Sequence, residues 1–218
     1  MDGNGRWAAG KGESRLFGHN AGSKAIKDLV SGAVEQGVEC LTVFAFSCDN
    51  KFRSEEEVSG LINLFISCLD EYIEELQQKG VRLVFIGDLS GLNTELHQRA
   101  MDASHRTAGC SKLTLTIAIN FSGTWHIVET TKKLLAQDEK PDDCQIVNAF
   151  DSLLPSHPDL LIRTGGERRL SNFILYHLGY TELFFLEVKW PDFSKAHLAS
   201  VIEEFGSRDR RYGRLSDG

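Results

Sequence analysis

The chain has few prolines, scattered cysteines and no long apolar run, and each shortage excludes a class of protein. Four prolines in 218 residues form no Pro-rich linker, so nothing divides the chain into separate domains. The five cysteines are odd in number and never spaced as Cys-x-x-Cys, which excludes a disulfide framework and predicts a reducing compartment. The longest apolar runs, LTVFAF and ELFFLEV, are far too short to span a bilayer.

Positive charge is also in short supply. The 24 Lys and Arg residues are outnumbered by 31 Asp and Glu residues, which leaves a net charge of −7. A protein that binds nucleic acid without sequence preference usually has the opposite sign, so we expect no nucleic-acid partner. With 41% hydrophobic residues, a chain of this length buries roughly 70% of its surface on folding, as a globular protein does.

Short apolar runs alternate with longer amphipathic stretches. Near-continuous apolar character predicts strands that are covered on both faces, at residues 41–47, 81–87, 113–119, 160–163 and 183–188. Helices are predicted at residues 21–36, 55–79, 94–108, 124–136 and 171–179, and the polar stretch 137–145 is predicted to be a loop. Ser54 and Glu57 form a capping box before the second helix, and Gly80 follows its end. This alternation predicts a single α/β domain over residues 1–218, with a central, mostly parallel sheet flanked by helices.

The first cluster of chemically active residues stands at the start of the chain. It holds an acid, two glycines, an amide, a cation and an aromatic ring, in the order Asp2, Gly3, Asn4, Gly5, Arg6 and Trp7. Glycines let a backbone approach a ligand closely, and N–H groups at a helix start bind phosphate. Arg6 offers a forked donor to phosphate oxygens, and Asp2 offers a ligand to Mg²⁺. The alternative is an Asn-Gly turn with incidental charges.

The second cluster is the segment RTGGERRLSN at residues 163–172. It follows a predicted strand, and in α/β folds ligands bind at the carboxyl ends of the strands. Its three arginines beside a glycine pair predict an anion-binding site, and the alternative is a set of surface arginines paired with Glu167. Two cationic clusters in a chain of negative net charge indicate selective attraction of an anion. Three further cations add to that field: Arg15, His19 and Arg53.

Together these motifs resemble those of the cis-prenyltransferases, the family of the undecaprenyl diphosphate synthases. The resemblance runs in the family's order along almost the whole chain, through MDGNGRWA, GHNAG, LTVFAFS, the stretch from Asp49 to Arg53, RTGGERRLSN and TELFFLEVKWPDF. Arg211-Tyr212-Gly213 resembles the family's C-terminal Arg-x-Gly. DGNGRW together with RTGGExRxSN is highly specific to the family.

The resemblance implies a reaction and an assembly. The reaction condenses isopentenyl diphosphate with an allylic diphosphate, forms a Z double bond and releases diphosphate. The fold implied is a single α/β domain that forms a homodimer, with a hydrophobic tunnel between sheet and helices for the growing isoprenoid. The lipid product implies at most a peripheral contact with membranes.

The resemblance also assigns roles position by position. Asp2 would place Mg²⁺ on a diphosphate, Glu182 would be a second metal-linked carboxylate, and Asn50 would act in proton removal. The allylic diphosphate would be held by Gly3, Asn4, Gly5, Arg6, Arg15 and His19, and isopentenyl diphosphate by Arg163, Arg169 and Ser171. Further substrate contacts are expected at Trp7, Ser47, Asp49, Lys51, Arg53 and Leu170. Because asparagine is a poor general base, we expect Asn50 to orient the substrate or a diphosphate oxygen that takes the proton.

Several positions depart from the family's pattern. After Asp49-Asn50 the usual Trp is Lys51, followed by Phe52, and residues 120–124 read NFSGT where the family more often has Asn-Tyr-Gly-Gly-Arg. A cation in place of a flat ring leaves open a short-chain enzyme of the neryl type, or an irregular enzyme of the lavandulyl type that couples two dimethylallyl diphosphates. A third alternative is a non-catalytic partner subunit of a heteromeric complex, although such a subunit needs no diphosphate site.

The start of the sequence raises one more expectation. Family members carry an apolar strand immediately before MDGNG, and we expect such a strand to precede Met1 in the natural protein. No signal peptide opens the chain, which predicts a cytoplasmic location. Removal of a transit peptide from a longer N-terminus would instead place the protein in the plastid stroma.

Overall fold

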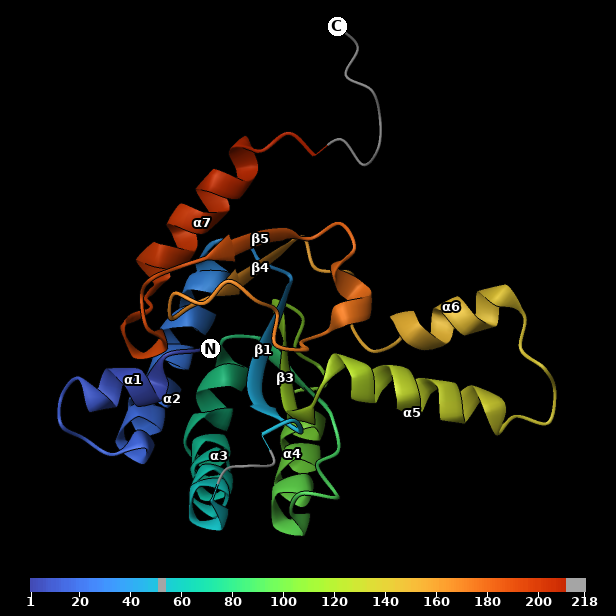
Figure 1. Ribbon diagram of the computed structural model, residues 1–218, viewed down its shortest axis with the longest axis horizontal. Coiled ribbons are helices and arrows are strands. Elements are labelled where there is room, and N and C mark those ends of the chain that lie inside the picture. Colours follow the sequence, from blue (N-terminus) through green and yellow to red (C-terminus); the bar gives the residue numbers. More distant parts are fainter. Residues whose placement is uncertain (51–53, 211–218) are drawn as a thin grey trace, which may run out of the picture.

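Parallel strands form the centre of the computed structural model, which describes residues 1–50 and 54–210 (Figure 1). Strands β1 (Cys40–Ser47), β2 (Val81–Ile86) and β3 (Leu113–Phe121) form a sheet in the order β1-β3-β2. Strand β4 (Leu160–Arg163) pairs with β5 (Glu182–Phe185) in a second, two-stranded sheet. Each of these pairings is parallel, which confirms the predicted class of fold.

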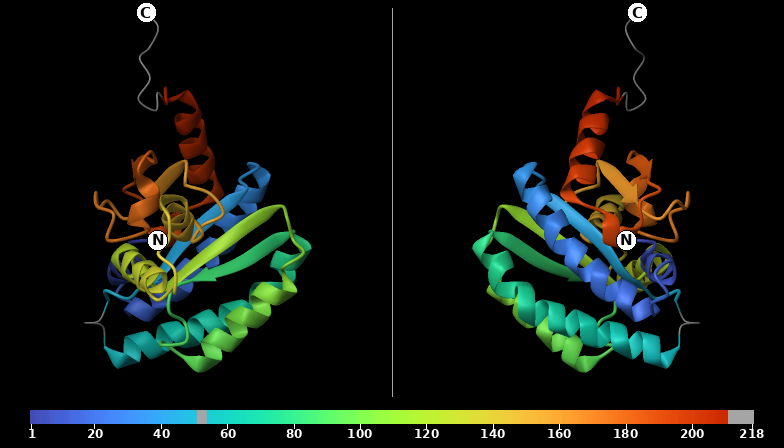
Figure 2. Two further views of the ribbon diagram at one scale, coloured as in Figure 1. Left: turned by 90° about the vertical axis from the view of Figure 1, so that its right-hand side faces the viewer. Right: turned by 90° about the vertical axis from the view of Figure 1, so that its left-hand side faces the viewer.

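Helices flank the strands on several sides (Figure 2). They are α1 (Asn4–Ala9), α2 (Arg15–Glu35), α3 (Glu55–Gln78), α4 (Thr94–Arg106), α5 (Gly123–Leu135), α6 (Asp143–Asp151) and α7 (Lys195–Ser207), with 3-10 turns η1 (Leu175–Leu178) and η2 (Trp190–Asp192). Helices α3 and α4 run along one face of the three-stranded sheet, and α2 packs against α3, α7 and η2. Helices α5 and α6 project from this body as a two-helix arm (Figure 1). None of the described helices combines the length and the apolar character of a membrane span.

The main core lies between the three-stranded sheet and the helices packed on it. Leu83, Leu113 and Leu115 from neighbouring strands are at most 1% exposed, and Val30 and Ala33 of α2 are equally well buried. Each large aliphatic side chain buried in this way stabilises the fold by roughly 1.5–3 kcal/mol. The continuous apolar runs that predict the strands are therefore the residues that fill this core.

The predicted helix at residues 171–179 is wrong. Ser171 and Asn172 have φ angles of 49° and 60°, and only Leu175–Leu178 forms a short 3-10 turn. The Asn172 side chain explains the turn, because its amide donates to Asp49 Oδ2 at 2.7 Å and to Thr124 Oγ1 at 2.8 Å. Contacts between residues far apart in the sequence thus outweigh the local preference for a helix.

Helices α1, α6 and α7 lie outside the predicted set, and α2 begins at Arg15 instead of residue 21. Side-chain caps explain two of these differences. Ser14 Oγ accepts from the Phe17 N–H at 3.2 Å, so α2 starts at the next residue. Asp142 and Gln145 form a capping box that starts α6 inside the stretch predicted to be a loop.

Three histidine rings join the arm to the body of the protein. His177 is 1% exposed, and its ring centroid lies 5.6 Å from that of His126 and 5.2 Å from that of His157. Its Nε2 lies 3.2 Å from the Phe150 carbonyl oxygen. Burial, with smaller contributions from the charges of His126 and His157, lowers the pKa of His177 to about 4. His177 is therefore neutral in the folded protein at neutral pH.

This lowered pKa predicts a loss of stability in mild acid. The pKa of His177 rises to its ordinary value of 6.5 on unfolding, so between pH 6.5 and about 4 the unfolded chain binds a proton that the folded chain does not. The free energy of unfolding should therefore fall as the pH falls through this window, by up to about 2 kcal/mol at pH 5. Urea unfolding at pH 7 and pH 5 measures the difference. His177→Phe should lose most of it, the exposed control His105→Phe should retain it, and equal pH dependence in all three proteins would contradict the assignment.

Candidate active site

The first residues of the chain are fastened to the end of β4. The Asp2 N–H donates to Thr164 Oγ1 at 3.0 Å, and the Thr164 hydroxyl donates to the Asp2 carbonyl oxygen at 2.8 Å. The Trp190 N–H donates to the same carbonyl oxygen at 3.0 Å. Gly3 then takes a left-handed conformation (φ 108°), where a Cβ would lie 3.0 Å from Lys189 Cβ, and α1 begins at the next residue. These contacts fix the Asp2 side chain at the carboxyl end of β4.

Charged side chains from both sequence clusters form one network beside β4. Arg163 Nη2 donates to Asp2 Oδ2 at 2.9 Å, and Arg6 Nη2 lies 3.4 Å from the same oxygen. Arg6 Nη1 lies 3.4 Å from Glu167 Oε1, and Glu167 Oε2 accepts from Arg169 Nη1 at 2.5 Å. Arg163 Nη1 closes the network by donating to the Arg169 carbonyl oxygen, and it also donates to the hydroxyl of Ser171 at 2.8 Å. We call these five charged residues the arginine–carboxylate network: Asp2, Arg6, Arg163, Glu167 and Arg169.

Asp2 is ionised within this network. Burial raises the pKa of its carboxyl, but the hydrogen bond and charge of Arg163 and the charge of Arg6 outweigh burial and hold the pKa below its ordinary value of 3.8. One donor and one acceptor beside the network, Arg163 Nε and Asn4 Oδ1, are buried without a hydrogen-bond partner among the described residues. An unmet buried donor or acceptor is costly, and a bound ligand would remove that cost.

Arg15 and His19 on α2 continue the site beyond α1 and share a carboxylate partner. Arg15 Nε lies 3.4 Å from Glu57 Oε1, and His19 Nε2 lies 3.6 Å from the same oxygen. A Cβ on Gly5 would lie 3.3 Å from Arg15 Cζ, so the guanidinium group of Arg15 also borders α1. The predicted capping box is half correct. Ser54 Oγ accepts from the Glu57 N–H at 3.2 Å, but the Glu57 side chain turns toward α2.

The end of β1 brings a further group of predicted residues to the site. The Asp49 N–H donates to Ser47 Oγ at 3.1 Å, and the Asn50 N–H donates to the Ser47 carbonyl oxygen at 3.2 Å. The Asn172 amide, which holds Asp49, links this turn to the second cluster. The remaining predictions for the neighbouring segment and for the C-terminus lie outside the described residues: Lys51, Phe52, Arg53, Arg211, Tyr212 and Gly213.

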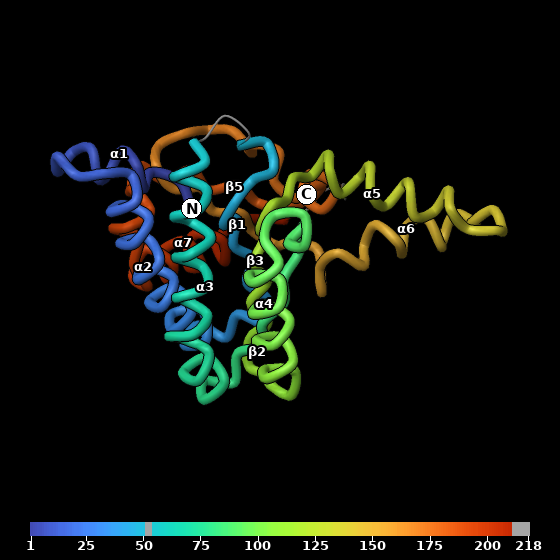
Figure 3. Tube along the Cα trace, turned by 90° about the horizontal axis from the view of Figure 1, so that it is seen from below, coloured from blue at the N-terminus to red at the C-terminus, as the bar shows by residue number. Residues whose placement is uncertain are grey.

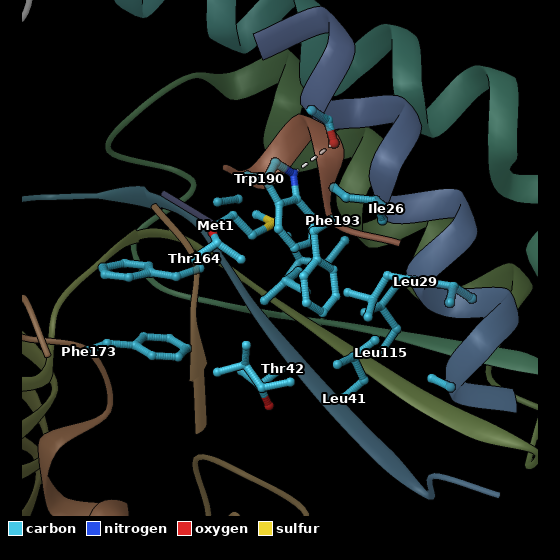
Figure 4. Close-up of a pocket in the computed structure, with 18 of the residues that line it drawn as sticks. Met1, Ile26, Leu29, Leu41, Thr42, Leu115, Thr164, Phe173, Trp190 and Phe193 are labelled. Carbon is cyan, nitrogen blue, oxygen red and sulfur yellow. Dashed lines mark hydrogen bonds between the residues drawn. The ribbon is translucent and has the colours of Figure 1, made fainter. Parts of the chain in front are cut away.

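A cavity of about 1240 Å³ is lined at one end by four residues of the arginine–carboxylate network, Asp2, Arg6, Arg163 and Arg169, and continues between α2, α3 and the strands. Away from the network its walls are largely apolar, with Ile26 and Leu29 from α2, Leu41 from β1 and Leu115 from β3 (Figure 4). Trp190 forms another part of the wall, and its indole N–H donates to the carbonyl oxygen of Gly22. Pockets for small molecules are commonly about 300–1000 Å³, so this cavity has room for a large apolar group.

Most of the predicted site residues line this one cavity. They are Asp2, Gly3, Asn4, Gly5, Arg6, Arg15, His19, Ser47, Asp49, Asn50, Arg163, Arg169, Leu170 and Ser171. Trp7 is not among the lining residues. Its indole N–H donates to Asp192 Oδ1 at 2.7 Å, and its ring stacks on Phe17 with centroids 5.9 Å apart. The structure therefore places the Trp7 side chain outside the cavity, against Phe17 of α2 and Asp192 of η2.

Glu182 also lies apart from the network. The register of β4 and β5 pairs Glu182 with Leu160 and Phe185 with Arg163. Glu182 is therefore about 10 Å along the strands from the end that carries Arg163. Its carboxylate accepts from Arg208 at 2.7 Å. The fold does not bring Asp2 and Glu182 together within one chain, and the metal role of Glu182 stays a prediction.

Three residues take part in the site although they were not selected from the sequence as ligand-binding residues. Thr164 holds the Asp2 backbone, and Asn172 ties the turn at Asp49 to the second cluster. Glu167 bridges Arg6 and Arg169, and its pairing with Arg169 is what the alternative interpretation of this segment predicted. All three stand within RTGGERRLSN, which is the signal that points to them. Glu167 was not selected as a ligand-binding residue because a carboxylate has the same sign of charge as the anion.

The fold and the site define an α/β protein suited to an amphiphile that has an anionic head and a hydrocarbon tail. Arginines gathered at one end of the cavity suit phosphate oxygens, and the apolar walls suit the tail.

Comparison with known proteins identifies the family. A family model described as "Putative undecaprenyl diphosphate synthase" matches residues 1–213. The chain belongs to this family, the cis-prenyltransferases, whose members condense isopentenyl diphosphate with an allylic diphosphate.

Individual relatives support the assignment along the whole chain. The ditrans,polycis-undecaprenyl-diphosphate synthase ((2E,6E)-farnesyl-diphosphate specific) of Escherichia coli K12 is 42% identical, over 100% of this chain and 89% of its own length. Lavandulyl diphosphate synthase from Lavandula x intermedia, solved with dimethylallyl diphosphate, superposes with a TM-score of 0.90 at 31% identity, covering 98% of this chain and 95% of that one. A probable undecaprenyl diphosphate synthase from Campylobacter jejuni gives a TM-score of 0.80 at 30% identity, covering 89% and 92%.

Proposed function

We propose that this chain is an active cis-prenyltransferase that makes a regular Z-polyprenyl diphosphate and draws the growing hydrocarbon into its cavity. The observation that carries the proposal is the continuity of the arginine–carboxylate network with a large apolar cavity. A partner subunit without catalysis would need no such charged end. In this proposal, the cavity is the hydrophobic tunnel that the family resemblance implies.

The chemistry needs an acceptor for the charge of the leaving group. The bond between C1 and oxygen of the allylic diphosphate breaks, and its electron pair leaves with diphosphate. The double bond of isopentenyl diphosphate attacks C1, and a proton leaves that substrate. Arg6 and Arg15 stabilise negative charge on the departing oxygen, because fixed donors in a dry site need no reorganisation. Asn50 at the end of β1 orients the group that takes the proton.

The residues at the charged end fit Mg²⁺. Asp2 is an ionised oxygen ligand, and Asn4 Oδ1 is a buried acceptor without a partner among the described residues. Proteins that handle phosphates commonly hold Mg²⁺ with one or two carboxylates plus substrate oxygens. In the described part of the chain, no group of three or more His, Cys, Asp or Glu residues is placed to hold a metal by itself. When bound, Mg²⁺ would supply a positive charge that neutralises the leaving diphosphate.

The two diphosphates bind to different parts of the charged site. We assign the allylic diphosphate to the N-terminal segment with Arg15 and His19, and isopentenyl diphosphate to Arg163, Arg169 and Ser171. Arg163 Nη1 already aligns the Ser171 hydroxyl and the Arg169 backbone. That alignment supports a single anion site built from the RTGGERRLSN segment.

Arg169→Ala should raise the KM for isopentenyl diphosphate by about 10- to 100-fold and move the allylic KM much less. A charge-assisted contact to phosphate contributes about 1.5–3 kcal/mol, and 1.4 kcal/mol corresponds to one decade. Steady-state kinetics with each substrate varied in turn measures both constants. The neighbouring exposed residue Arg168 does not line the cavity, so Arg168→Ala is the matched control. Equal weakening of both substrates would contradict the division of the site.

Product analysis tests the proposed function directly. The purified chain is given Mg²⁺ and isopentenyl diphosphate with dimethylallyl, geranyl or farnesyl diphosphate, and the products are identified by mass spectrometry. We expect Z-polyprenyl diphosphates. No condensation product with any starter would overturn the proposal.

The likeness to lavandulyl diphosphate synthase favours one alternative, an irregular coupling of two dimethylallyl diphosphates. Incubation with dimethylallyl diphosphate alone distinguishes the two reactions. Our proposal predicts no product from that incubation. A branched C10 diphosphate would establish the irregular enzyme instead.

We also propose that the chain forms a homodimer through the arm. Apolar side chains on and beside the arm are exposed to solvent, including Val128, Leu135, Val147 and Tyr180, and Leu135 is 79% exposed. Val128 and Leu135 both stand on α5, and exposed apolar side chains gathered on one element are typical of an interface between subunits. Analytical ultracentrifugation should give twice the mass of the chain.

A further inference from the structure

Helices α2 and α3 run side by side in the same direction and wall one side of the cavity (Figure 3). Polar contacts join them at two places, which lie at the start and at the end of α3. At the end near the arginine–carboxylate network, Arg15 and His19 meet Glu57. At the other end, Lys27 Nζ lies 2.6 Å from Glu75 Oε2, and Lys79 Nζ lies 2.7 Å from Glu75 Oε1.

This second group forms a compact ionic cluster. Lys79, which directly follows α3, donates from Nζ to Ser31 Oγ at 2.7 Å, so Lys27 and Ser31 of α2 are tied to Glu75 and to the end of α3. We call Lys27, Ser31, Glu75 and Lys79 the distal ion cluster. Hydrogen bonds from Lys27 and Lys79 outweigh burial and hold the pKa of Glu75 below its ordinary value, so the cluster stays charged at neutral pH.

The distal ion cluster lies on the wall of the cavity. Lys27, Glu75 and Lys79 all line it, together with the apolar residues Leu69 and Leu76 of α3. Lys27 is twelve residues beyond Arg15 on α2, which places it about 18 Å farther along the helix. The cavity wall therefore runs from a charged site, past apolar side chains, to a second set of charges.

We propose that the distal ion cluster limits how far a hydrocarbon chain extends between α2 and α3, and so helps to set the length of the product. This inference rests on the proposed function for the identity of the chain. Two contacts of this cluster cross between the helices, Lys27 with Glu75 and Lys79 with Ser31, so a hydrocarbon that passes between α2 and α3 must separate both. Lys27 then loses its partner and part of its hydration beside the hydrocarbon, which is unfavourable. The cluster is also a third to a half exposed, so the chain beyond it would enter water.

The test replaces one residue of the cluster from each helix with alanine. Lys27→Ala/Glu75→Ala removes the ion pair that joins α2 to α3 and the bulk of its two side chains. Given the same starter and excess isopentenyl diphosphate, we expect the main product to lengthen by at least one isoprene unit. The matched control is Glu35→Ala/Lys195→Ala, which removes an ion pair of 3.1 Å that joins α2 to α7 and does not line the cavity. Its product length should equal that of the wild type.

A binding measurement separates failure of this inference from failure of the proposed function. Affinities for a series of polyprenyl monophosphates of increasing length are measured by calorimetry for wild type, cluster variant and control. The wild type and the control should stop gaining affinity at the same length, and the cluster variant should continue to gain beyond it. Glu75→Gln, which keeps the size of the side chain, should give the same change in smaller degree and serves if the double variant does not fold. An unchanged limit in the cluster variants, or an equal shift in the control, would overturn the inference, whereas absence of turnover with the expected binding pattern would count only against the proposed reaction.

Discussion

Asp2→Ala should lower kcat by at least about 100-fold and leave the protein folded. Asp2 stands where it meets Arg163 and Arg6, and removal of a single preorganised group that acts on charge in the transition state commonly costs 10²–10³ in rate. Because the loss is in the transition state, kcat and kcat/KM should fall together. Steady-state kinetics with saturating substrates measures both.

Asp70→Ala is the matched control for this change. Asp70 pairs with Arg99 at 3.0 Å on the surface of α3 and does not line the cavity, so its loss should leave kcat unchanged. Excess EDTA should abolish wild-type activity, and added Mg²⁺ should restore it. Turnover near that of the wild type in Asp2→Ala, or full activity in EDTA, would disprove the role given to Asp2.

The same carboxylate should leave a signature in the pH dependence of stability. Its pKa is lowered on folding, so its contribution to stability is present above the unfolded value near 3.8 and is lost as the pH falls through the lower folded value. The difference in unfolding free energy between wild type and Asp2→Ala should therefore shrink in strong acid.

Gly165→Ala should damage both stability and activity. Gly165 has a φ of 89°, and a Cβ there would lie 2.9 Å from Arg6 Nη2 and 3.1 Å from the Asp2 carbonyl. A left-handed backbone costs a residue with a side chain about 1–2 kcal/mol, and the added methyl must also displace the arginine–carboxylate network. We expect a destabilisation of about 2–4 kcal/mol in urea unfolding and at least a tenfold loss of kcat/KM.

Gly12→Ala distinguishes the cost of a strained backbone from the cost of displacing the arginine–carboxylate network. Gly12 has a similar φ of 74°, but nothing lies within 4 Å of the position of an added Cβ. This variant should therefore lose only the backbone term, about 1–2 kcal/mol, and keep full activity. Equal kinetics for both glycine variants would show that the contact with the network is unimportant.

Strands were predictable from the sequence because each is a continuous apolar run, and such a run is stable only when both faces of the strand are buried. Residues 160–163 form β4 as predicted, and β1, β2 and β3 differ from prediction by no more than two residues at each end. Helix starts were less predictable, since they depend on single side chains such as Ser14 and Asp142. The segment at Asn172 was predicted wrongly because its conformation is set by Asp49 and Thr124, which local patterning does not reveal.

The site was predictable as a set of residues but not as an arrangement. Spacing alone left an Asn-Gly turn and a group of surface arginines as alternatives, and the family resemblance decided between the readings. Asp2 and Arg163 stand 161 positions apart, so the contact between them exists only through the end of β4. A match to a family motif does not fix the position of every side chain in it. Residues 2–6 line the cavity, whereas the Trp7 ring faces Asp192.

Each arginine of the arginine–carboxylate network already has an acidic or carbonyl partner within the chain. A diphosphate that binds Arg6, Arg163 or Arg169 must therefore compete with Asp2 and Glu167, and each carboxylate it displaces becomes available to a cation. In the mechanism proposed above, anion and divalent cation are thus linked ligands that favour each other's binding. Thermodynamic reciprocity requires the factor to be the same in both directions. The dissociation constant for Mg²⁺ should fall when inorganic diphosphate is present, by the factor with which Mg²⁺ tightens the binding of diphosphate.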